Sequence, residues 1–281
     1  MVLALDVGNS RLTAAWADAT GSGEPTVRSQ ETQTRDISAD QLDTLLREML
    51  DLGADPLERR VGAMVVASVV PAWSAAIREL AARHGLACLE ASAETVPIPV
   101  RVDRATEAGA DRLVNAFAAG RFYGTPAIVV DFGTATTLDV VAADGAYIGG
   151  AIAAGLEPGL DALAARTARL PRIELAAPDR VIGTDTVSAM RSGAVIGHIG
   201  LANELIRRTR AELAAQSPAG ARIQVIATGG LSNEPWVEEI EGIDVIAPTL
   251  TIRGLLLLWQ TMGDGGTEPA EDASPVAKVR A

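Results

Sequence analysis

The chain has 281 residues, a formal net charge of −12 and a composition that is 48% hydrophobic but only 3% aromatic. This composition excludes a disordered chain and predicts a closely packed aliphatic core in one large domain or two ordinary ones. No cluster of Lys and Arg stands out, which argues against nucleic acid or an anionic membrane as the main partner. A single cysteine, Cys88, excludes a disulfide framework and a cysteine-based zinc cluster, and fits a reducing compartment.

Nothing in the sequence predicts membrane insertion. The opening MVLALDVGNS has no basic stretch ahead of an apolar one, and no apolar run approaches the roughly 18 residues of a spanning helix. We therefore expect a cytoplasmic protein that does not contact membranes.

The first part of the chain predicts a strand hairpin followed by alternating helices and strands. Two strands surround a tight Gly-Asn-Ser turn at 8–10. Apolar residues at helical spacing predict a helix within 37–53, with Ser38 at its N-cap and Gly53 just past its end. In chain order there follow a buried strand at 61–71, a helix at 72–85 and a short strand at 87–92.

The second part repeats this order. In chain order we expect a helix at 109–124, three strands within 126–155, helices at 158–170 and 183–216, a strand at 222–228 that enters a Gly-Gly turn, and a helix at 249–263. The stretch from Gly263 to the last residue is rich in Gly, Pro, Ala and charge, and predicts a disordered tail at 263–281. Because both halves share one order of elements, we predict a duplicated α/β unit.

Asp6 and Asp131 occupy matching places, each near the end of an apolar strand and two residues before a glycine. An ionised carboxylate inside a sheet costs several kcal/mol unless it is paired or bound to a cation. Gly8 and Gly133 would let the following backbone N–H groups approach a phosphate where the chain turns sharply. We expect two such loops to face each other across a cleft and bind a nucleotide, although one Asp-x-Gly alone is often only a turn.

Hydroxyl groups follow both turns, and a third glycine element comes later in the chain. The hydroxyl residues are Ser10, Thr13, Thr134, Thr136 and Thr137. The ATGG stretch at 227–230 would let the backbone pass flat against a planar group such as adenine. Together these segments predict a nucleotide site.

Several segments, taken in order, resemble the type III pantothenate kinase family, also called the Bvg accessory factor family. They are DVGNS at 6–10, ASVVP at 67–71, GADRLVNA at 109–116, DFGTATTLDVV at 131–141, GGAIAAGL at 149–156, ARTARLP at 165–171, GTDTVSAMRSGAVIGHIG at 183–200 and ATGG at 227–230. The resemblance covers roughly residues 1–260. It implies an α/β fold with two duplicated lobes of the acetate and sugar kinase/Hsp70/actin (ribonuclease H-like) type, each a mixed sheet flanked by helices. We place the lobes at 1–112 and 113–262.

The resemblance implies ATP-dependent phosphorylation of pantothenate to 4′-phosphopantothenate, the first step of coenzyme A biosynthesis. It also implies a homodimer that needs Mg²⁺ and a monovalent cation, K⁺ or NH₄⁺. The helical region at 188–206, which contains several small residues, would form the dimer interface.

The resemblance carries site roles residue by residue. The ATP-binding residues it implies are Asp6, Val7, Gly8, Asn9, Ser10, Arg11, Leu12, Thr13 and Thr134. The substrate-binding residues it implies are Gly109, Ala110, Asp111 and Arg112, with Thr186 supplied by the dimer partner. Asp111 would be the general base, kept ionised by Arg112 beside it, and Asp131 the monovalent-cation ligand, with Asp6 as a further metal ligand.

The chain departs from the family pattern just before GADR. Val102, Arg104 and Ala105 stand where the family has Tyr, Asn and Pro, which puts the acceptor pocket in question. Two alternatives follow: a related small-molecule kinase with a changed acceptor, and a nucleotide-binding regulatory protein without turnover. His84 and His198 lack metal-ligand spacing and are expected to be structural.

Overall fold

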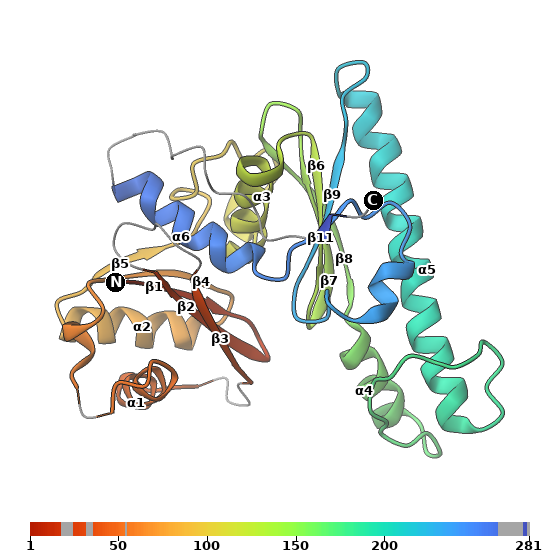
Figure 1. The fold of residues 1–281 in the computed structure, drawn as a ribbon, viewed down its shortest axis with the longest axis horizontal. Coiled ribbons are helices and arrows are strands. Elements are labelled where there is room, and N and C mark those ends of the chain that lie inside the picture. Colours follow the sequence, from red (N-terminus) through yellow and green to blue (C-terminus); the bar gives the residue numbers. More distant parts are fainter. Residues whose placement is uncertain (18–24, 32–35, 54, 264–277, 280–281) are drawn as a thin grey trace. The chain divides into compact units, whose positions relative to one another are not determined.

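The computed structural model describes residues 1–17, 25–31, 36–53, 55–263 and 278–279 (Figure 1). The chain divides into two compact units, of which unit 1 comprises 1–118 and 250–273, and unit 2 comprises 119–249 and 274–281. The sequence placed the boundary after residue 112, whereas the units divide inside helix α3 (Ala110–Tyr123). Helix α6 (Leu250–Gly263) belongs to unit 1 because it packs on strands of that unit, a long-range contact that its place in the sequence does not indicate.

Unit 1 is built on a five-stranded mixed sheet. Its other elements are, in chain order, β1 (Val2–Val7), β2 (Arg11–Ala17), β3 (Thr26–Glu31), α1 (Ala39–Met49), the 3-10 helix η1 (Leu57–Arg59), β4 (Ala63–Ser68), α2 (Pro71–Arg83), β5 (Ala87–Glu90) and the 3-10 helix η2 (Ala105–Glu107). The strand order is β3-β2-β1-β4-β5. Strand β1 pairs antiparallel with β2 and parallel with β4, so it lies at the centre of the sheet.

The two faces of this sheet carry different helices. Leu3 and Leu5 of β1 share a buried cluster with Leu42 of α1 and Ile77 of α2. Helix α6 packs on β1, β2 and β4, and Figure 1 shows it on the side of the sheet opposite α1 and α2. Alternate residues of β1 therefore face different helices, as the period of two in a strand requires.

Helix α1 shows how local and distant contacts together set its ends. Ser38 caps its first turn and forms a capping box with Gln41, which confirms the predicted start. The helix ends at Met49, before the predicted stop at Gly53. The helix is closed locally, because Asp51 has a positive φ of 54° and the Leu52 N–H donates to the Arg47 carbonyl oxygen at 2.9 Å. Arg28 of β3 adds a distant contact, since it donates to the Met49 carbonyl oxygen at 2.7 Å and pairs with the Asp51 carboxylate.

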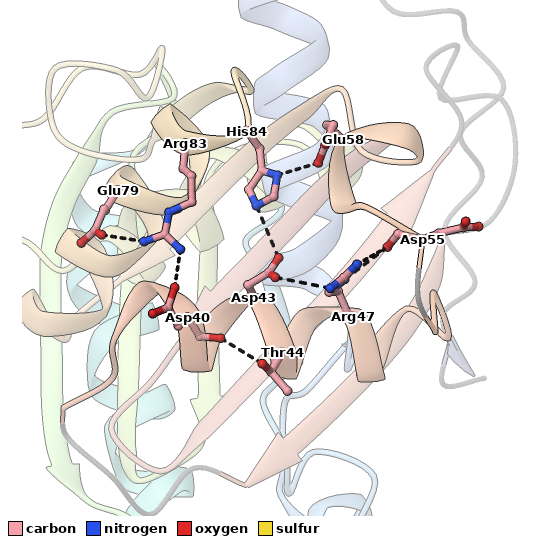
Figure 2. Close-up of polar contacts among 9 residues, drawn as sticks. All are labelled: Asp40, Asp43, Thr44, Arg47, Asp55, Glu58, Glu79, Arg83 and His84. Carbon is pink, nitrogen blue, oxygen red and sulfur yellow. Dashed lines mark hydrogen bonds and ion pairs between the residues drawn. The ribbon is translucent and has the colours of Figure 1, made fainter.

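A polar network joins α1, η1 and the end of α2 (Figure 2). The Nδ1 atom of His84 lies 2.5 Å from Glu58 Oε2, and its Nε2 atom lies 3.5 Å from Asp43 Oδ1. The backbone N–H of Glu58, and then His84, lower the pKa of the Glu58 carboxyl. His84 thus ties three elements together, which agrees with the predicted structural role. Across the described ranges, no group of three or more His, Cys, Asp or Glu residues could hold a metal ion.

Unit 2 repeats the arrangement around a six-stranded sheet. Besides the last turns of α3, its elements are β6 (Ala127–Phe132), β7 (Ala135–Val141), β8 (Tyr147–Ala154), α4 (Leu156–Arg166), α5 (Thr186–Gln216), β9 (Gln224–Thr228), the 3-10 helix η3 (Pro235–Glu239), β10 (Val245–Ile246) and β11 (Lys278–Val279). The strand order is β11-β10-β9-β6-β7-β8. Helices α4 and α5 lie on one side of this sheet (Figure 1).

The two sheets share one topology. The order β3-β2-β1-β4-β5 of unit 1 corresponds to β8-β7-β6-β9-β10 of unit 2, with matching parallel and antiparallel pairings. The predicted duplication is therefore confirmed. Strands β3, β10 and β11 were not predicted, and β11 lies within the predicted tail, where it pairs with β10. The rest of that tail beyond Gly263 lies outside the described residues.

Two further expectations can be checked in the described parts of the chain. No helix there combines the length and the apolar character that crossing a membrane requires. Cys88 is partly buried, and burial raises the pKa of its thiol to about 11, so it behaves as a structural residue.

Candidate functional site

Asp6 lies near the end of the central strand of unit 1. In the sheet register it stands opposite Thr13 of β2 and Ala67 of β4. The Thr13 hydroxyl lies 3.1 Å from the Ser29 hydroxyl of β3. Asp6 alternates with Leu5 and Val7 of the buried cluster, so its carboxylate belongs to the opposite sheet face, the face of α6.

The loop after Asp6 contains both packing residues and exposed polar residues. The side chains of Val7 and Leu12 are buried in the core of unit 1. Asn9, Ser10 and Arg11 are exposed, and the Gly8 N–H donates to the Arg11 carbonyl oxygen at 2.9 Å. In the predicted phosphate loop, the side chains of residues 9–11 are therefore accessible to a ligand. Val7 and Leu12 could contribute only backbone groups.

The two glycines predicted to let a phosphate approach are not needed for the backbone conformation of their turns. Neither Gly8 nor Gly133 has a positive φ. A Cβ at Gly8 would lie 3.5 Å from the Arg11 carbonyl oxygen, and one at Gly133 would lie 3.5 Å from Asp131 Oδ1, both ordinary contacts. What glycine provides at both positions is space beside the loop, which is what a close-approaching ligand would need.

Asp111 occupies the first turn of α3. The Leu113 N–H donates to the Gly109 carbonyl oxygen, so Gly109 precedes the helix and Asp111 lies inside it rather than at the N-cap. The Arg112 N–H donates to Asp111 Oδ1 at 2.8 Å. A Cβ on Gly109 would lie 2.6 Å from that same oxygen, so glycine is needed to make room for the carboxylate. The GADR motif therefore holds the Asp111 side chain in one place.

Burial is the main influence on the Asp111 carboxyl. Removal from water raises its pKa, and the backbone N–H and positive charge of Arg112 oppose that rise. The sequence predicted that Arg112 would dominate and favour ionisation. The direction of the Arg112 effect is as predicted, but it is smaller than the effect of burial, which depends on packing that a motif does not reveal.

Helix α6 positions the start of α3. The Thr251 hydroxyl donates to Asn115 Oδ1 at 2.7 Å, and both residues are buried. Gly254 lies against α3 so closely that a Cβ there would be 2.8 Å from Val114 Cγ1. Because α6 also packs on β1, the helix that carries Asp111 is fixed to the sheet that carries Asp6.

Asp131 occupies the same place in unit 2 as Asp6 in unit 1. It stands opposite Thr137 of β7 and Thr228 of β9. Gly229 has φ +93, and a Cβ there would lie 2.3 Å from Asp131 Oδ1. This glycine has a structural role, because its missing side chain lets the end of β9 close against the Asp131 carboxylate. Its place beside adenine stays a prediction.

A second loop closes on the turn that follows Asp131. The Gly155 N–H donates to the Thr134 carbonyl oxygen at 3.1 Å, and a Cβ on Gly155 would lie 2.3 Å from the Gly133 carbonyl oxygen. The Thr134 side chain is exposed, as its predicted ATP contact requires. The structure therefore brings the turns at 133–134, 155 and 229 together around Asp131.

Thr136 was grouped with the ligand-facing hydroxyls, and this was wrong. It alternates with Thr137 along β7 and points to the core, where its hydroxyl lies 2.9 Å from His198 Nε2. Burial lowers the pKa of His198, which packs against Phe132 and Trp236. The structural role predicted for this histidine is confirmed.

Thr186 is the first residue of α5 and is exposed. Asp185 before it caps the helix by accepting the Ser188 N–H at 2.9 Å, and this bond lowers the pKa of Asp185. The preceding segment is held tightly: Ser192 donates to the Val181 carbonyl oxygen, and a Cβ on Gly183 would collide with the Ala189 backbone. The backbone around Thr186 is therefore held in place by the helix cap and by the packing of the preceding segment.

The geometry can be compared with known proteins. A family model described as type III pantothenate kinase matches residues 2–208. Proteins named type III pantothenate kinase from Frankia alni and Roseiflexus castenholzii are 41% and 39% identical to this chain, with 92% of this chain covered in each case and 99% and 98% of those proteins. The chain belongs to the type III pantothenate kinase family.

Solved structures support the fold. A Baf family protein from Campylobacter jejuni has a TM-score of 0.55 at 14% identity, covering 93% of this chain and 99% of that chain. The Lmo2764 protein of Listeria monocytogenes, assigned as an N-acetylmannosamine kinase, has a TM-score of 0.51 at 15% identity, covering 94% and 99%. At these identities the likeness shows the fold alone, and it confirms the predicted two-lobed α/β architecture.

Membership of the family gives the activity. The chain is a kinase that uses ATP to phosphorylate pantothenate to 4′-phosphopantothenate, the first step of coenzyme A biosynthesis.

The contact between Gly229 and Asp131 predicts a large stability effect. Gly229→Ala should lower the free energy of unfolding by at least about 3 kcal/mol, because it adds a collision to the strain of a positive φ. Gly145→Ala is the matched control, since Gly145 has φ +85 and nothing within 4 Å of its Cβ position. It should cost only about 1–2 kcal/mol. Urea denaturation would measure both, and equal costs would contradict the collision.

The raised pKa of Asp111 predicts a pH-dependent stability. Ionising a carboxyl whose folded pKa is raised costs stability, so this cost is absent below the pKa of the unfolded chain, near 3.9, and grows as pH rises through the folded pKa. Asp111→Asn should therefore be more stable than the native protein at neutral pH, and the difference should shrink in acid. Chemical denaturation across a pH series would test this, and a variant less stable at neutral pH would contradict it.

Proposed function

We propose that Asp111 is the general base of pantothenate phosphorylation. The observation that supports this role is its half-buried carboxylate, fixed by the Arg112 N–H beside a glycine that makes room for it. A base works best when its pKa approaches the working pH, and burial moves Asp111 in that direction. Arg112 opposes the shift and so keeps enough of the carboxyl ionised to accept a proton.

The proposed reaction is a single in-line transfer. The hydroxyl oxygen of pantothenate forms a bond to the γ-phosphorus of ATP while the bond from that phosphorus to the β–γ bridging oxygen breaks, which releases ADP. The hydroxyl proton passes to the Asp111 carboxylate as the new bond forms. Gly109 and Ala110 would shape the surroundings of that carboxylate, and Arg112 would place a positive charge beside the substrate.

Phosphate binding is proposed for the loops that follow the two strand-ending aspartates. In unit 1, Asn9, Ser10 and Arg11 offer exposed donors, and the space beside Gly8 lets a phosphate approach. In unit 2, Thr134 offers an exposed hydroxyl beside Gly133. That both loops serve one nucleotide stays a prediction.

Cation binding is proposed for the same aspartates. Asp6 would take part in holding Mg²⁺, and Asp131 would hold K⁺ or NH₄⁺. Carboxylate oxygens are ligands that such hard cations prefer, and the two aspartates occupy equivalent places at the ends of the central strands. When bound, the cations would neutralise charge on the phosphates.

A cytoplasmic location is also part of the proposed function, because the enzyme uses intracellular ATP.

A homodimer is proposed because apolar side chains near Thr186 are exposed on a fixed segment. Val181 is 69% exposed and Ile182 is 79% exposed, although Gly183 and Ser192 hold their backbone against α5. Side chains of this kind are typical of a surface that another chain covers. In this arrangement Thr186 would reach the pantothenate bound by the partner.

The role of Asp111 predicts a specific loss of turnover. With ATP, Mg²⁺ and K⁺, the native protein should phosphorylate pantothenate, and Asp111→Asn should lower kcat by roughly 10²-fold or more, the scale of a lost general base. Asp36→Asn is the matched control, since Asp36 is exposed in the same unit and lies outside the predicted site. The acid limb of kcat/KM should lie above the ordinary aspartate pKa. Turnover unchanged in Asp111→Asn would remove it from this role.

The same assay should include pantothenate analogues and simple sugars, because Val102, Arg104 and Ala105 change the segment before GADR. Pantothenate should give the highest kcat/KM. A higher value for another alcohol would favour a changed acceptor, and binding of ATP without transfer to any acceptor would favour the regulatory alternative.

The proposed dimer predicts coupled changes in mass and substrate affinity. Ile182→Glu should give a monomer by analytical ultracentrifugation and should raise KM for pantothenate, because Thr186 of the partner is lost. Met262→Glu is the control, since Met262 is also exposed and apolar but lies in unit 1. A monomeric Ile182→Glu protein with native kcat/KM would refute the contribution of Thr186.

A further inference from the structure

The hydroxyl of Thr228 is buried without a hydrogen-bond partner among the described residues. Thr228 is fully buried at the end of β9, and its Oγ1 atom makes no hydrogen bond. Buried hydroxyl groups in proteins are nearly always bonded, and leaving one unpaired costs about 1–3 kcal/mol. A polar atom kept at such a cost points to a ligand.

The sheet register places this hydroxyl beside Asp131. Thr228 and Asp131 are opposite each other in the parallel pair β9–β6, so their side chains leave the sheet on the same face. The Asp131 carboxylate also leans toward β9, since its Oδ1 atom lies 2.3 Å from where a Cβ on Gly229 would be. A carboxylate oxygen and an unbonded hydroxyl therefore lie on adjacent strands at the same sheet edge.

The duplicated unit provides an internal comparison. In unit 1 the equivalent row is Thr13, Asp6 and Ala67, and in unit 2 it is Thr137, Asp131 and Thr228. The sheet thus accepts alanine at this position. The hydroxyls of Thr13 and Thr137 are bonded within the protein, to Ser29 and to Asp139. The hydroxyl at 228 is therefore an addition particular to unit 2.

We propose that the Thr228 hydroxyl is a second protein ligand of the monovalent cation at Asp131, and that it makes unit 2 the K⁺-selective unit. This rests on the proposed cation role of Asp131. One carboxylate and one neutral hydroxyl supply a single negative charge, which matches a monovalent ion. A phosphate oxygen would instead be repelled by the carboxylate.

The charge of this ligand pair favours a monovalent cation over Mg²⁺. Mg²⁺ is usually bound through one or two carboxylates together with substrate phosphates, and it keeps several waters. A neutral hydroxyl adds no charge to the single carboxylate, so the pair suits K⁺ better than Mg²⁺.

The test measures K⁺ binding by the full chain without relying on turnover. The unfolding temperature would be followed as KCl replaces choline chloride at constant ionic strength, with and without Mg²⁺ and a non-hydrolysable ATP analogue. The native protein should be stabilised by K⁺, and Thr228→Val should raise the K⁺ concentration at half effect by roughly tenfold or more, the scale for disturbing a metal site. Thr228→Ser, which restores a hydroxyl, should keep the native midpoint, and Asp131→Asn should abolish the response.

Two control variants keep the outcome clear. Thr136→Val removes a buried hydroxyl from the opposite face of the same sheet, so it should lower the unfolding temperature without moving the K⁺ midpoint. If Thr228→Val does not fold, the K⁺ midpoint is measured on Thr228→Ala instead. This variant also lacks the hydroxyl, and unit 1 has alanine at the equivalent position.

The proposal is overturned if the native protein shows no K⁺ response in either series, if removing the hydroxyl leaves the midpoint unchanged, or if Thr228→Ser behaves like Thr228→Val. Its failure is distinct from failure of the proposed function. Phosphorylation of pantothenate with a K⁺ midpoint independent of Thr228 would refute the ligand alone. A K⁺ midpoint that depends on Thr228, in a protein whose Asp111→Asn variant turns over normally, would refute the base alone.

Discussion

A carboxylate near the end of the central strand of each sheet is the constraint around which both units are arranged. Asp6 and Asp131 hold the same register, each opposite a threonine on the antiparallel neighbour. A carboxylate in such a place destabilises the fold unless something compensates it. In unit 2 two turns pack closely around the Asp131 region, because Gly155 and Gly229 have no side chains and approach at distances no Cβ would allow.

The two units use one framework for different tasks. Unit 1 joins its aspartate to helix α3 through α6, so that Asp6 and the proposed base Asp111 belong to one packed body. Unit 2 instead surrounds its aspartate with hydroxyl groups and fixes the first turn of α5 separately. Duplication explains why the sheets match strand for strand, and the differences at equivalent positions, such as Ala67 and Thr228, show where the units diverged in chemistry.

The sequence predicted what local periodicity and repetition determine. The start of α1 followed from Ser38 and Gln41, and the duplicated order followed from the alternation of apolar runs. Other features were missed. The end of α1 was expected at Gly53 because glycine is the usual residue in the left-handed turn that closes a helix, whereas Asp51 takes that conformation here. Thr136 was assigned to the wrong face because neighbouring hydroxyls along a strand point in opposite directions. An unbonded hydroxyl such as Thr228 has no sequence pattern, since its neighbours in space decide its state.

The pKa of the Asp111 carboxyl cannot be predicted from the GADR motif alone. The motif explains the hydrogen bond from the Arg112 N–H and the need for glycine at 109, because both are local. The larger effect on the carboxyl is burial, which comes from the surrounding packing and not from the motif. The same burial that makes the ionised fold less stable makes the carboxylate a stronger base. The stability cost and the proposed catalytic role therefore have one physical origin.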